Sequence, residues 1–279
     1  MAVSLDTLRT HFFERAHWVD PDSSADRVFY GDLGREVRKI GLGWMPCVQN
    51  LEAAAAAGCD LFISHETMFY GEWAPGIESE QTVWGQARLA VLKKHDMACI
   101  NLHDTWDNFP EYGIRDSWRT FLGLSEPLAE RSYYYRGTGR FAQQKSLVMT
   151  RTAPQTLAEF ATVVASQCSI FPMSHGVTVQ GDADARIETV ATGVGCHIPT
   201  WEMAELGADV LVLTYDRALQ TAIRIPLLEM GCNLICVEHG VSELPGMQSM
   251  ARYLERTFPV TATFYCCEPG ARTVLARRV

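Results

Sequence analysis

The feature that most constrains the fold is a regular alternation of short apolar runs with helical patterns. Strand-like runs lie at Lys39–Trp44, Leu61–Ser64, Ala98–Leu102, Ser146–Thr150, Val177–Gln180, Glu188–Thr192, Val210–Leu213, Leu234–Val237 and Val260–Phe264. Helical patterns lie at Val48–Ala57, Val83–Lys94, Ile114–Leu122, Thr156–Ser166, Pro199–Leu206, Ala218–Met230 and Gly246–Thr257. Apolar strands that alternate with helices indicate an α/β protein with mixed, largely parallel sheets.

A weak internal repeat suggests that the chain holds two similar α/β lobes. Leu89–His103 and Ile225–His239 each show a helix end, a turn, a buried strand and then a histidine at the same offset. Upstream, Gly58–His65 resembles Gly207–Thr214. The stretch Gln143–Arg186 has a strand–helix–strand–strand pattern, typical of a distinct lobe or an insertion. We expect two interlinked lobes, the first formed by residues 1–125 together with 235–279 and the second by residues 126–234.

Composition narrows the range of partners. The 279 residues suffice for a core of one large or two small domains, and the net charge is −9 without a block of Lys or Arg. This balance argues against nucleic-acid binding. No apolar run reaches transmembrane length, and the N-terminal stretch lacks the apolar segment of a signal peptide. We therefore expect no nucleic-acid partner and no membrane association.

The nine cysteines include no C-x-x-C pair. Cys59, Cys99, Cys232 and Cys236 lie in or beside apolar runs, where a free thiol behaves as a small hydrophobic group. This usage predicts a cytoplasmic protein without a disulfide framework.

Histidines and carboxylates follow three of the predicted strands. His65 and Glu66 follow Leu61–Ser64; His103, Asp104 and Asp107 follow Ala98–Leu102; Glu238, His239 and Glu243 follow Leu234–Val237. Open α/β sheets bind ligands at the carboxyl ends of their strands, and imidazole and carboxylate are ligands of Zn²⁺, Mn²⁺ and Fe²⁺. A single histidine after a strand is more often structural, but three such strand ends indicate a metal site. We expect His239 and Glu243 to lie on a loop after the strand, and Pro245 to begin the helix that follows.

Three motifs carry a resemblance to a known family. They are AAAAAGCDLFISHE, HDTWDNFPEYGIRDSWRTFLGL and LICVEHGVSELPGMQSMARYL, within a region from about Lys39 to Phe264. Together they resemble the Nif-three-like family, the dinuclear metal-centre proteins related to NGG-interacting factor three. The resemblance implies a Nif-three-like fold and a centre of two divalent metal ions, with Zn, Fe or Mn expected. Some family members are described as type-two GTP cyclohydrolase I homologues.

The resemblance also implies the ligands. His65, Asp107, His239 and Glu243 match family ligands, while Glu66 stands where the family has its second histidine. The implied arrangement gives one ion to His65, His239 and Glu243, which suits Zn²⁺ or Fe²⁺. The other ion takes Glu66, Asp107 and the bridging Glu243, an all-oxygen set that favours Mn²⁺ or Mg²⁺. Alternatively, the glutamate at position 66 leaves only one ion bound.

His103 matches a family histidine that lies beside the metals. We interpret it as a residue that supports the ligands or acts as a general acid or base; the alternative is a histidine that caps its own loop. Two departures leave the substrate open. Thr214-Tyr215-Asp216 lacks a family glycine, and Trp44-Met45-Pro46 stands where the family often has an aspartate.

Other residues give weaker signals. Gly193–Gly195 either binds an anion before a helix or forms a turn that needs glycine torsions. His197 is a minor candidate for facing the binding cleft, and Tyr133–Tyr135 either stack on a ligand or belong to the core or an interface. We assign the remaining histidines to the surface or to packing: His11, His17, His95 and His175.

Two classes of function are consistent with these residues. One is a metal-dependent hydrolase that acts on a small, phosphate- or nucleotide-containing substrate. The other is a metal-binding or scaffold protein without turnover. An open coordination position in a ligand-sized pocket would distinguish the first from the second. The resemblance further implies a homohexamer, a ring of three dimers.

Overall fold

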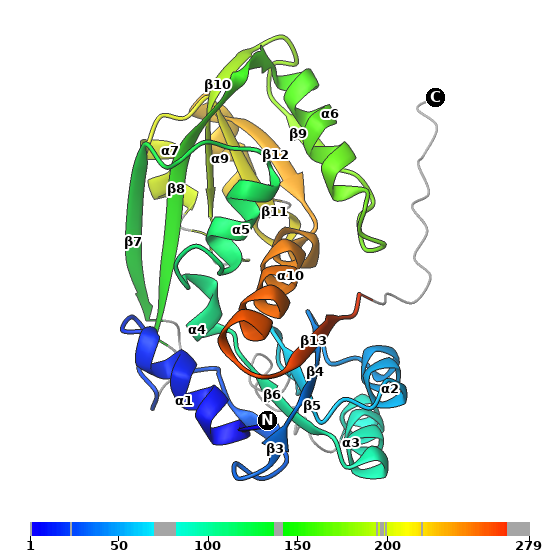
Figure 1. The fold of residues 1–279 in the computed structure, drawn as a ribbon. Helices are drawn as coiled ribbons and strands as arrows, with labels where there is room; N and C mark the ends of the chain where they lie inside the picture. The colour runs from blue at the N-terminus through cyan, green and yellow to red at the C-terminus, as the bar shows by residue number, and fades with distance from the viewer. Residues whose placement is uncertain are drawn as a thin grey trace, which may run out of the picture. The chain divides into compact units, whose positions relative to one another are not determined.

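The computed structural model describes residues 2–22, 24–69, 82–136, 142–193, 195, 198, 200–218 and 220–266 (Figure 1). These residues form two compact units. The first unit contains the described residues within Met1–Ser117, Tyr134–Gln144 and Leu244–Cys266. The second contains Trp118–Tyr133 and Lys145–Glu243. Both units are built on a sheet with parallel strands at its centre, as the alternating pattern predicts.

The sheet of the first unit has the strand order β13-β4-β5-β6-β2. The strands are β2 (Val28–Tyr30), β4 (Lys39–Gly43), β5 (Leu61–Ser64), β6 (Ala98–Asn101) and β13 (Thr261–Phe264). β13, β4, β5 and β6 are parallel, and β2 pairs antiparallel with β6 at the edge. Two short strands, β1 (Val3–Ser4) and β3 (Glu36–Val37), form a separate antiparallel pair. The parallel pairing places the carboxyl ends of β5 and β6 side by side.

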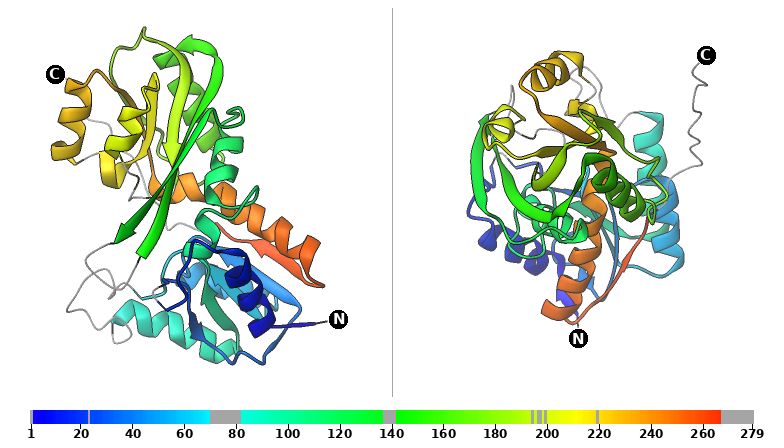
Figure 2. Two further views of the ribbon diagram at one scale, coloured as in Figure 1. Left: turned by 90° about the vertical axis from the view of Figure 1, so that its left-hand side faces the viewer. Right: turned by 90° about the horizontal axis from the view of Figure 1, so that it is seen from above.

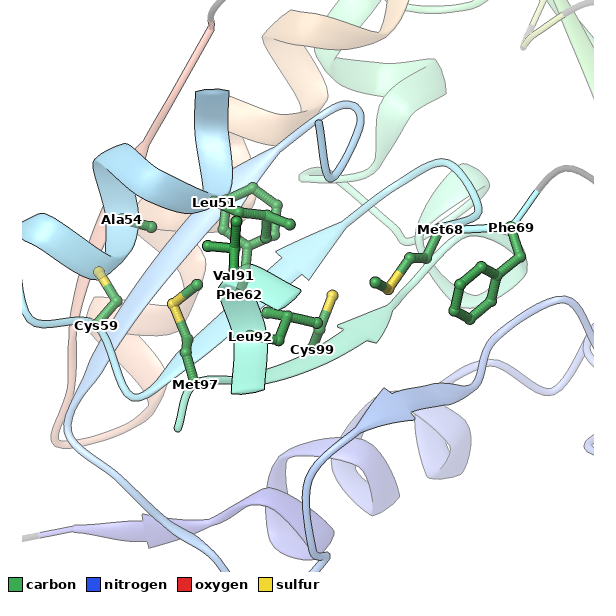
Figure 3. Packing of buried hydrophobic residues seen from close by; sticks show 10 residues of the cluster. All are labelled: Leu51, Ala54, Cys59, Phe62, Met68, Phe69, Val91, Leu92, Met97 and Cys99. Atoms are coloured by element: carbon green, nitrogen blue, oxygen red, sulfur yellow. The ribbon is translucent and has the colours of Figure 1, made fainter. Parts of the chain in front are cut away.

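Helices α2 (Val48–Ala56) and α3 (Val83–His95) contribute to the core of the first unit. Figure 3 shows the buried side chains that fill this core, among them Phe62 of β5 and Leu92 of α3. The close approach of β4 to α2 requires glycine, since a Cβ at Gly41 would lie 2.7 Å from the Cβ of Ala54. Burying such side chains contributes roughly 1.5–3 kcal/mol each, which anchors the strands that carry the candidate site.

Three other helices of the first unit meet in an aromatic cluster. Phe12 of α1 (Leu5–Arg15) contacts Trp106 of α4 (Asp104–Asp107) edge to face, with 5.7 Å between ring centroids. The Trp106 indole donates a hydrogen bond of 3.0 Å to the carbonyl of Gly246, in helix α10 (His239–Thr257). The short helix α4 is therefore packed between two longer helices.

The sheet of the second unit has the order β7-β8-β10-β11-β12-β9. Its strands are β7 (Ala129–Arg136), β8 (Ala142–Thr156), β9 (Thr178–Gln180), β10 (Arg186–Gly193), β11 (Val210–Thr214) and β12 (Asn233–Val237). β10, β11 and β12 are parallel, whereas β8 and β9 pair antiparallel with their neighbours. The long strands β7 and β8 run side by side and are green in Figure 2. The remaining helices are α5 (Ile114–Phe121), α6 (Leu157–Cys168), α7 (Thr200–Glu205), α8 (Tyr215–Ala218) and α9 (Thr221–Glu229).

The structure confirms the predicted class, an α/β protein with mixed and largely parallel sheets. One prediction about an element was wrong, because α10 begins at His239 and not near Pro245. Among the described residues, no helix is both long enough and apolar enough to cross a membrane.

The cysteines in the apolar runs lie largely in the two cores. Cys59 and Cys99 belong to the core of the first unit and Cys236 to that of the second, while Cys232 is partly buried and packs against the latter. Burial raises the pKa of Cys99 to about 12 and that of Cys236 to about 11. Such thiols remain protonated at neutral pH and act as apolar groups.

Candidate metal centre

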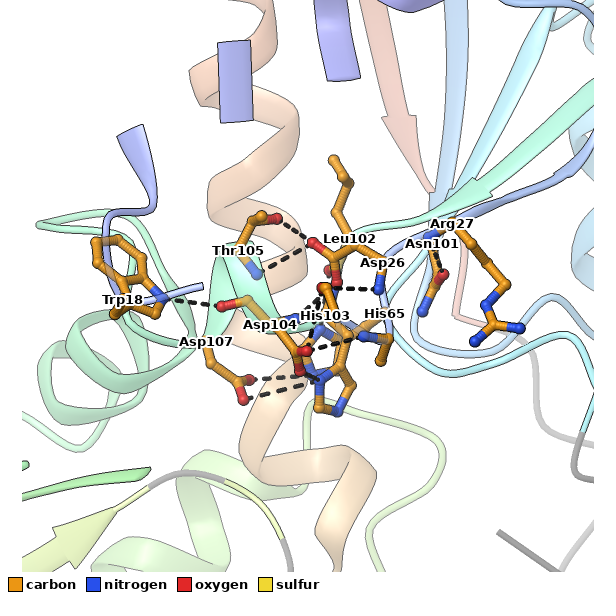
Figure 4. A network of polar contacts seen from close by, with 12 residues as sticks. Trp18, Asp26, Arg27, His65, Asn101, Leu102, His103, Asp104, Thr105 and Asp107 are labelled. Carbon is orange, nitrogen blue, oxygen red and sulfur yellow. Dashed lines mark hydrogen bonds and ion pairs between the residues drawn. The ribbon is translucent and has the colours of Figure 1, made fainter. Parts of the chain in front are cut away.

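In the first unit, candidate ligands follow two neighbouring parallel strands. His65 comes directly after β5, whose last residue, Ser64, pairs with Asn101 at the end of β6. His103 is the residue before α4, and Asp107 is the last residue of that helix. The pairing of the two strands brings these side chains together (Figure 4).

The three side chains form a compact, buried group. The rings of His65 and His103 are stacked, with centroids 4.5 Å apart and planes 16° from parallel. His65 Nε2 lies 3.4 Å from Asp107 Oδ1, and His103 Nδ1 lies 3.9 Å from Asp107 Oδ2. One ligand atom from each residue lies within 4.8 Å of the others. Two imidazoles and a carboxylate are a donor set that suits Zn²⁺ or Fe²⁺.

The hydrogen bond of His65 fits a ligand role. Its Nδ1 lies 3.3 Å from the carbonyl oxygen of Leu102, so that the Nδ1–H can donate there. This leaves the lone pair on Nε2, the nitrogen that faces Asp107. Histidines that bind metals are commonly oriented in this way, because the bond of one nitrogen fixes the tautomer of the other.

The charges around His103 favour a cation. Burial by itself lowers the pKa of His103, but the carboxylates of Asp107 and Asp104 outweigh burial and raise it to about 10. Burial and the charge of Asp104 raise the pKa of Asp26 to about 6. A buried surplus of carboxylates is costly without a positive partner, and a proton or a metal ion at this place relieves that cost.

In the second unit, His239 and Glu243 form a second candidate pair. They are one turn apart on α10, with His239 Nε2 3.0 Å from Glu243 Oε1. His239 Nδ1 lies 3.0 Å from Asp216 Oδ2. Burial tends to raise the pKa of Asp216, but its hydrogen bond to His239 prevails and lowers it. An imidazole held at Nδ1 by a carboxylate presents Nε2 to an ion.

Gly195 leaves space beside the side chains of His239 and Glu243. Its φ is +62°, in the left-handed region that favours glycine, as the prediction of a glycine turn requires. A Cβ at this position would lie 3.1 Å from Glu243 Oε1 and 3.5 Å from His239 Nε2. The backbone therefore leaves room beside both candidate ligands that any larger residue would fill. His197, the other candidate in this stretch, lies outside the described residues.

The local structure of this pair corrects the expected loop. The Glu238 carboxylate accepts a hydrogen bond of 2.9 Å from the N–H of Val241, which caps the start of α10. Pro245 lies inside the helix, which continues past it. His239 and Glu243 therefore project from a helix, whose geometry fixes their spacing better than a loop would.

The structure also describes most of the other predicted residues. Glu66 follows His65 in the first unit and is 9% exposed. His11 hydrogen-bonds to the hydroxyl of Tyr253, and His95 lies 3.3 Å from a Glu52 oxygen. His17 and His175 are exposed, and the side chains of Tyr133–Tyr135 lie outside the described residues.

Sequence reasoning missed two aspartates with close contacts to the candidate histidines. Asp26 accepts hydrogen bonds from the backbone of His103 and its neighbours, and no local pattern marks it. Asp216 stood out only as a departure from the family motif. Its place at the end of a strand was the signal that could have identified it.

Comparisons with known proteins are consistent with this geometry. The model of a family described as Duf34/NIF3 (NGG1p interacting factor 3) matches residues 25–269. Two curated relatives are each named GTP cyclohydrolase 1 type 2 homolog. The one from Treponema pallidum (strain Nichols) is 26% identical over 125 residues, which cover 45% of this chain and 42% of that protein. The one from Chlamydia pneumoniae is 22% identical over 248 residues, which cover 84% of this chain and 86% of that protein.

A solved structure, that of a Bacillus cereus protein related to NIF3, has the same fold. It superposes with a TM-score of 0.74 over 98% of this chain and 99% of its own, at 12% identity. At this low identity the likeness concerns the fold alone.

Proposed function

Because this chain belongs to the Duf34/NIF3 family, we propose that it binds two divalent metal ions and hydrolyses a small substrate with them. The observation that carries the proposal is the buried group of His65, His103 and Asp107, whose ligand atoms lie within 4.8 Å of one another. The proposed ligands of the second ion are His239 and Glu243, one turn apart on α10, and Glu66, which the family resemblance implies as a ligand. Zn²⁺, Fe²⁺ and Mn²⁺ are the ions that such donors favour.

This partition differs from the one that the family resemblance implies. His103 joins His65 and Asp107 as a third donor of the first ion, and Glu243 belongs to the second ion. Whether Glu243 also bridges both ions remains a prediction. Glu243→Gln removes one ion per chain if the carboxylate serves a single site and both if it bridges.

The residues present suit hydrolysis. A divalent ion acts as a Lewis acid toward a phosphoryl or carbonyl oxygen. Asp107 and Glu243 supply negative charge that holds the ions, and the imidazoles of His65 and His239 are oriented by Leu102 O and Asp216. The general acid or base role predicted for His103 is an alternative to ligation, and its contact with Asp104 serves either role.

The substrate proposed is a small molecule that contains phosphate, such as a nucleotide. Two relatives are named GTP cyclohydrolase 1 type 2 homolog, so GTP belongs in the first panel of substrates. The alternative function, a metal-binding or scaffold protein without turnover, uses the same ligands.

Metal analysis followed by turnover assays tests the proposal. We expect about two ions per chain after reconstitution and hydrolysis of a nucleotide or phosphoester that a chelator abolishes and metal restores. A chain that retains no metal after dialysis overturns the metal proposal. A chain that binds two ions but turns over no member of a broad panel favours the non-catalytic alternative.

We also propose a homohexamer in the cytoplasm. This rests on the family resemblance alone. Light scattering should give about six times the 31.1 kDa of one chain. A mass equal to one chain at micromolar concentration would reject the hexamer.

A further inference from the structure

Two segments of the first unit, far apart in sequence, are joined through a buried aspartate. Asp26 is 5% exposed and accepts hydrogen bonds from three consecutive backbone N–H groups (Figure 4). The distances are 2.6 Å from His103, 2.7 Å from Asp104 and 3.1 Å from Thr105. The Thr105 hydroxyl also donates to the same carboxylate. Asp26 therefore holds the backbone of His103, the residue before α4, and of the first two residues of that helix.

Asp104 in turn accepts hydrogen bonds from the segment that precedes Asp26. Its Oδ2 accepts hydrogen bonds from the backbone of Ala25, at 2.8 Å, and from the hydroxyl of Ser24, at 3.1 Å. Its Oδ1 lies 2.8 Å from His103 Nδ1. One carboxylate oxygen is thus held by the neighbouring segment while the other holds the imidazole. The backbone and the ring of His103 are both fixed by this exchange.

We propose that Asp104 and Asp26 are positioning residues for His103, which together hold its backbone and its Nδ1 and leave its Nε2 as the nitrogen available to a metal ion or substrate. The inference rests on the proposed function of the first ligand group. An Nδ1–H that donates to Asp104 leaves the lone pair on Nε2, and such carboxylate partners tune histidine ligands. Asp26 adds the constraint on the backbone, without which the ring could not stay within the narrow geometry that a metal requires.

Capping of α4 alone does not account for both aspartates. The bonds of Asp26 to three N–H groups satisfy the start of that helix. The contact of Asp104 with the imidazole satisfies no backbone group of α4, so it needs a reason of its own. A role for His103 in the site supplies that reason.

Asp104→Asn gives a sharp test. The Ala25 N–H needs an acceptor, so the amide oxygen of the asparagine should turn to it and the NH₂ group to His103. The NH₂ group would then donate to Nδ1 and place the ring proton on Nε2, the wrong tautomer for ligation. We expect the affinity for zinc to fall about 10–100-fold, the usual effect of losing such a partner.

A matched control comes from the second unit. Asp209 accepts hydrogen bonds from the backbone of Glu188 and Thr189 and from the Thr189 hydroxyl, the same kinds of donor that Asp26 binds. Asp26→Asn and Asp209→Asn should both lower the melting temperature. Only Asp26→Asn should also weaken zinc binding.

The experiment measures zinc affinity by competition with a chelator and the state of the histidine nitrogens by ¹⁵N NMR of the zinc-loaded chain. We expect the wild type and Asp209→Asn to show zinc on Nε2 of His103, and Asp104→Asn to lose that signal. Wild-type affinity and spectrum in Asp104→Asn would overturn the inference, even if Asp26→Asn fails to fold. A wild-type chain that binds no zinc would instead overturn the proposed function, and this inference with it.

Discussion

The two units share a scaffold but differ in what stands at the ends of their strands. In the first unit, Gly58 precedes β5 with a φ of +75°, and Asp60 accepts hydrogen bonds from the backbone of Arg38 and Lys39. In the second, Gly207 precedes β11 with a φ of +69°, and Asp209 accepts them from Glu188 and Thr189. These contacts are structurally equivalent, so the weak sequence repeat reflects a repeated unit of structure.

The difference begins where the strands end. β5 is followed by His65, whereas the equivalent residue of the second unit is Thr214, whose hydroxyl contacts Asp216. The first unit thus holds a group of three candidate ligands, and the second holds a candidate histidine and glutamate on α10. A scaffold can therefore be repeated while its binding edge is not, because the strand ends carry little of the core.

The largest change in metal affinity is expected at the end of β5, and none of similar size at the equivalent end of β11. His65→Ala should weaken metal binding more than about 100-fold, because it removes a proposed ligand and not merely an outer partner. Thr214→Ala, at the equivalent position, should change the affinity by less than about threefold, since its hydroxyl contacts no candidate ligand directly. Titration against a chromophoric chelator measures both. Equal losses of metal affinity in the two variants would contradict the assignment of His65, and not Thr214, to the metal site.

The next effect concerns the partner of His239. Asp216→Asn should lower affinity for the second ion about 10-fold, because the asparagine can no longer hold Nδ1 as a charged acceptor. Asp182→Asn, which alters an exposed aspartate of the same unit, is the control. Metal content after dialysis against increasing chelator gives the two affinities. Unchanged retention in Asp216→Asn would argue that His239 is not a ligand.

A glycine pair tests the space beside His239 and Glu243. Gly195→Ala and Gly207→Ala both place alanine in the left-handed region, so each should lower the free energy of unfolding by about 1–2 kcal/mol. Only Gly195→Ala should weaken metal binding as well, about tenfold or about 1.4 kcal/mol. The reason is that nothing lies within 4 Å of a Cβ at Gly207. Equal metal affinities in the two variants would mean that the space at Gly195 serves only the turn.

The smallest expected effect should be the same in both units. Asp60→Asn and Asp209→Asn should each lower the free energy of unfolding by about 1 kcal/mol at neutral pH, as the loss of a typical hydrogen bond does. Neither should alter metal affinity. Urea unfolding of each variant, with and without zinc, measures both quantities. A loss of metal affinity in Asp209→Asn would show that Asp209 supports the metal site as well as the fold.

One of these variants, Asp209→Asn, also gives a dependence on pH. Burial tends to raise the pKa of Asp209, but its bonds to the Glu188 and Thr189 N–H groups and the Thr189 hydroxyl lower it. Its contribution is therefore full above the unfolded value of about 3.9 and disappears as the pH falls through the lower folded value. The stability difference between wild type and Asp209→Asn should stay constant from pH 7 to about pH 5 and shrink below about pH 4. A difference that grows on acidification would contradict the assignment.

The fold class and most of the central strands follow from the sequence alone. β5 occupies the predicted Leu61–Ser64, because a short apolar run bounded by polar residues has few alternatives to a buried strand. The start of α10 was missed, since Pro245 suggested a boundary that the cap of Glu238 and the buried face of the helix override. Helix α1 was missed as well. Its buried positions, Leu5, Leu8 and Phe12, are too few to stand out as a periodic pattern.

For the site, the sequence supplied the residue types and the tertiary structure supplied the neighbours. Histidine and carboxylate after a buried strand mark a place where polar groups need a partner, and that signal is local. The meeting of His65 with His103 and Asp107 depends on β5 lying next to β6, which only the order of the sheet decides. Asp26 was invisible for the same reason, because it bonds to His103 across 77 residues of chain. Periodicity records which face of an element is buried, but not which distant segment will cover it.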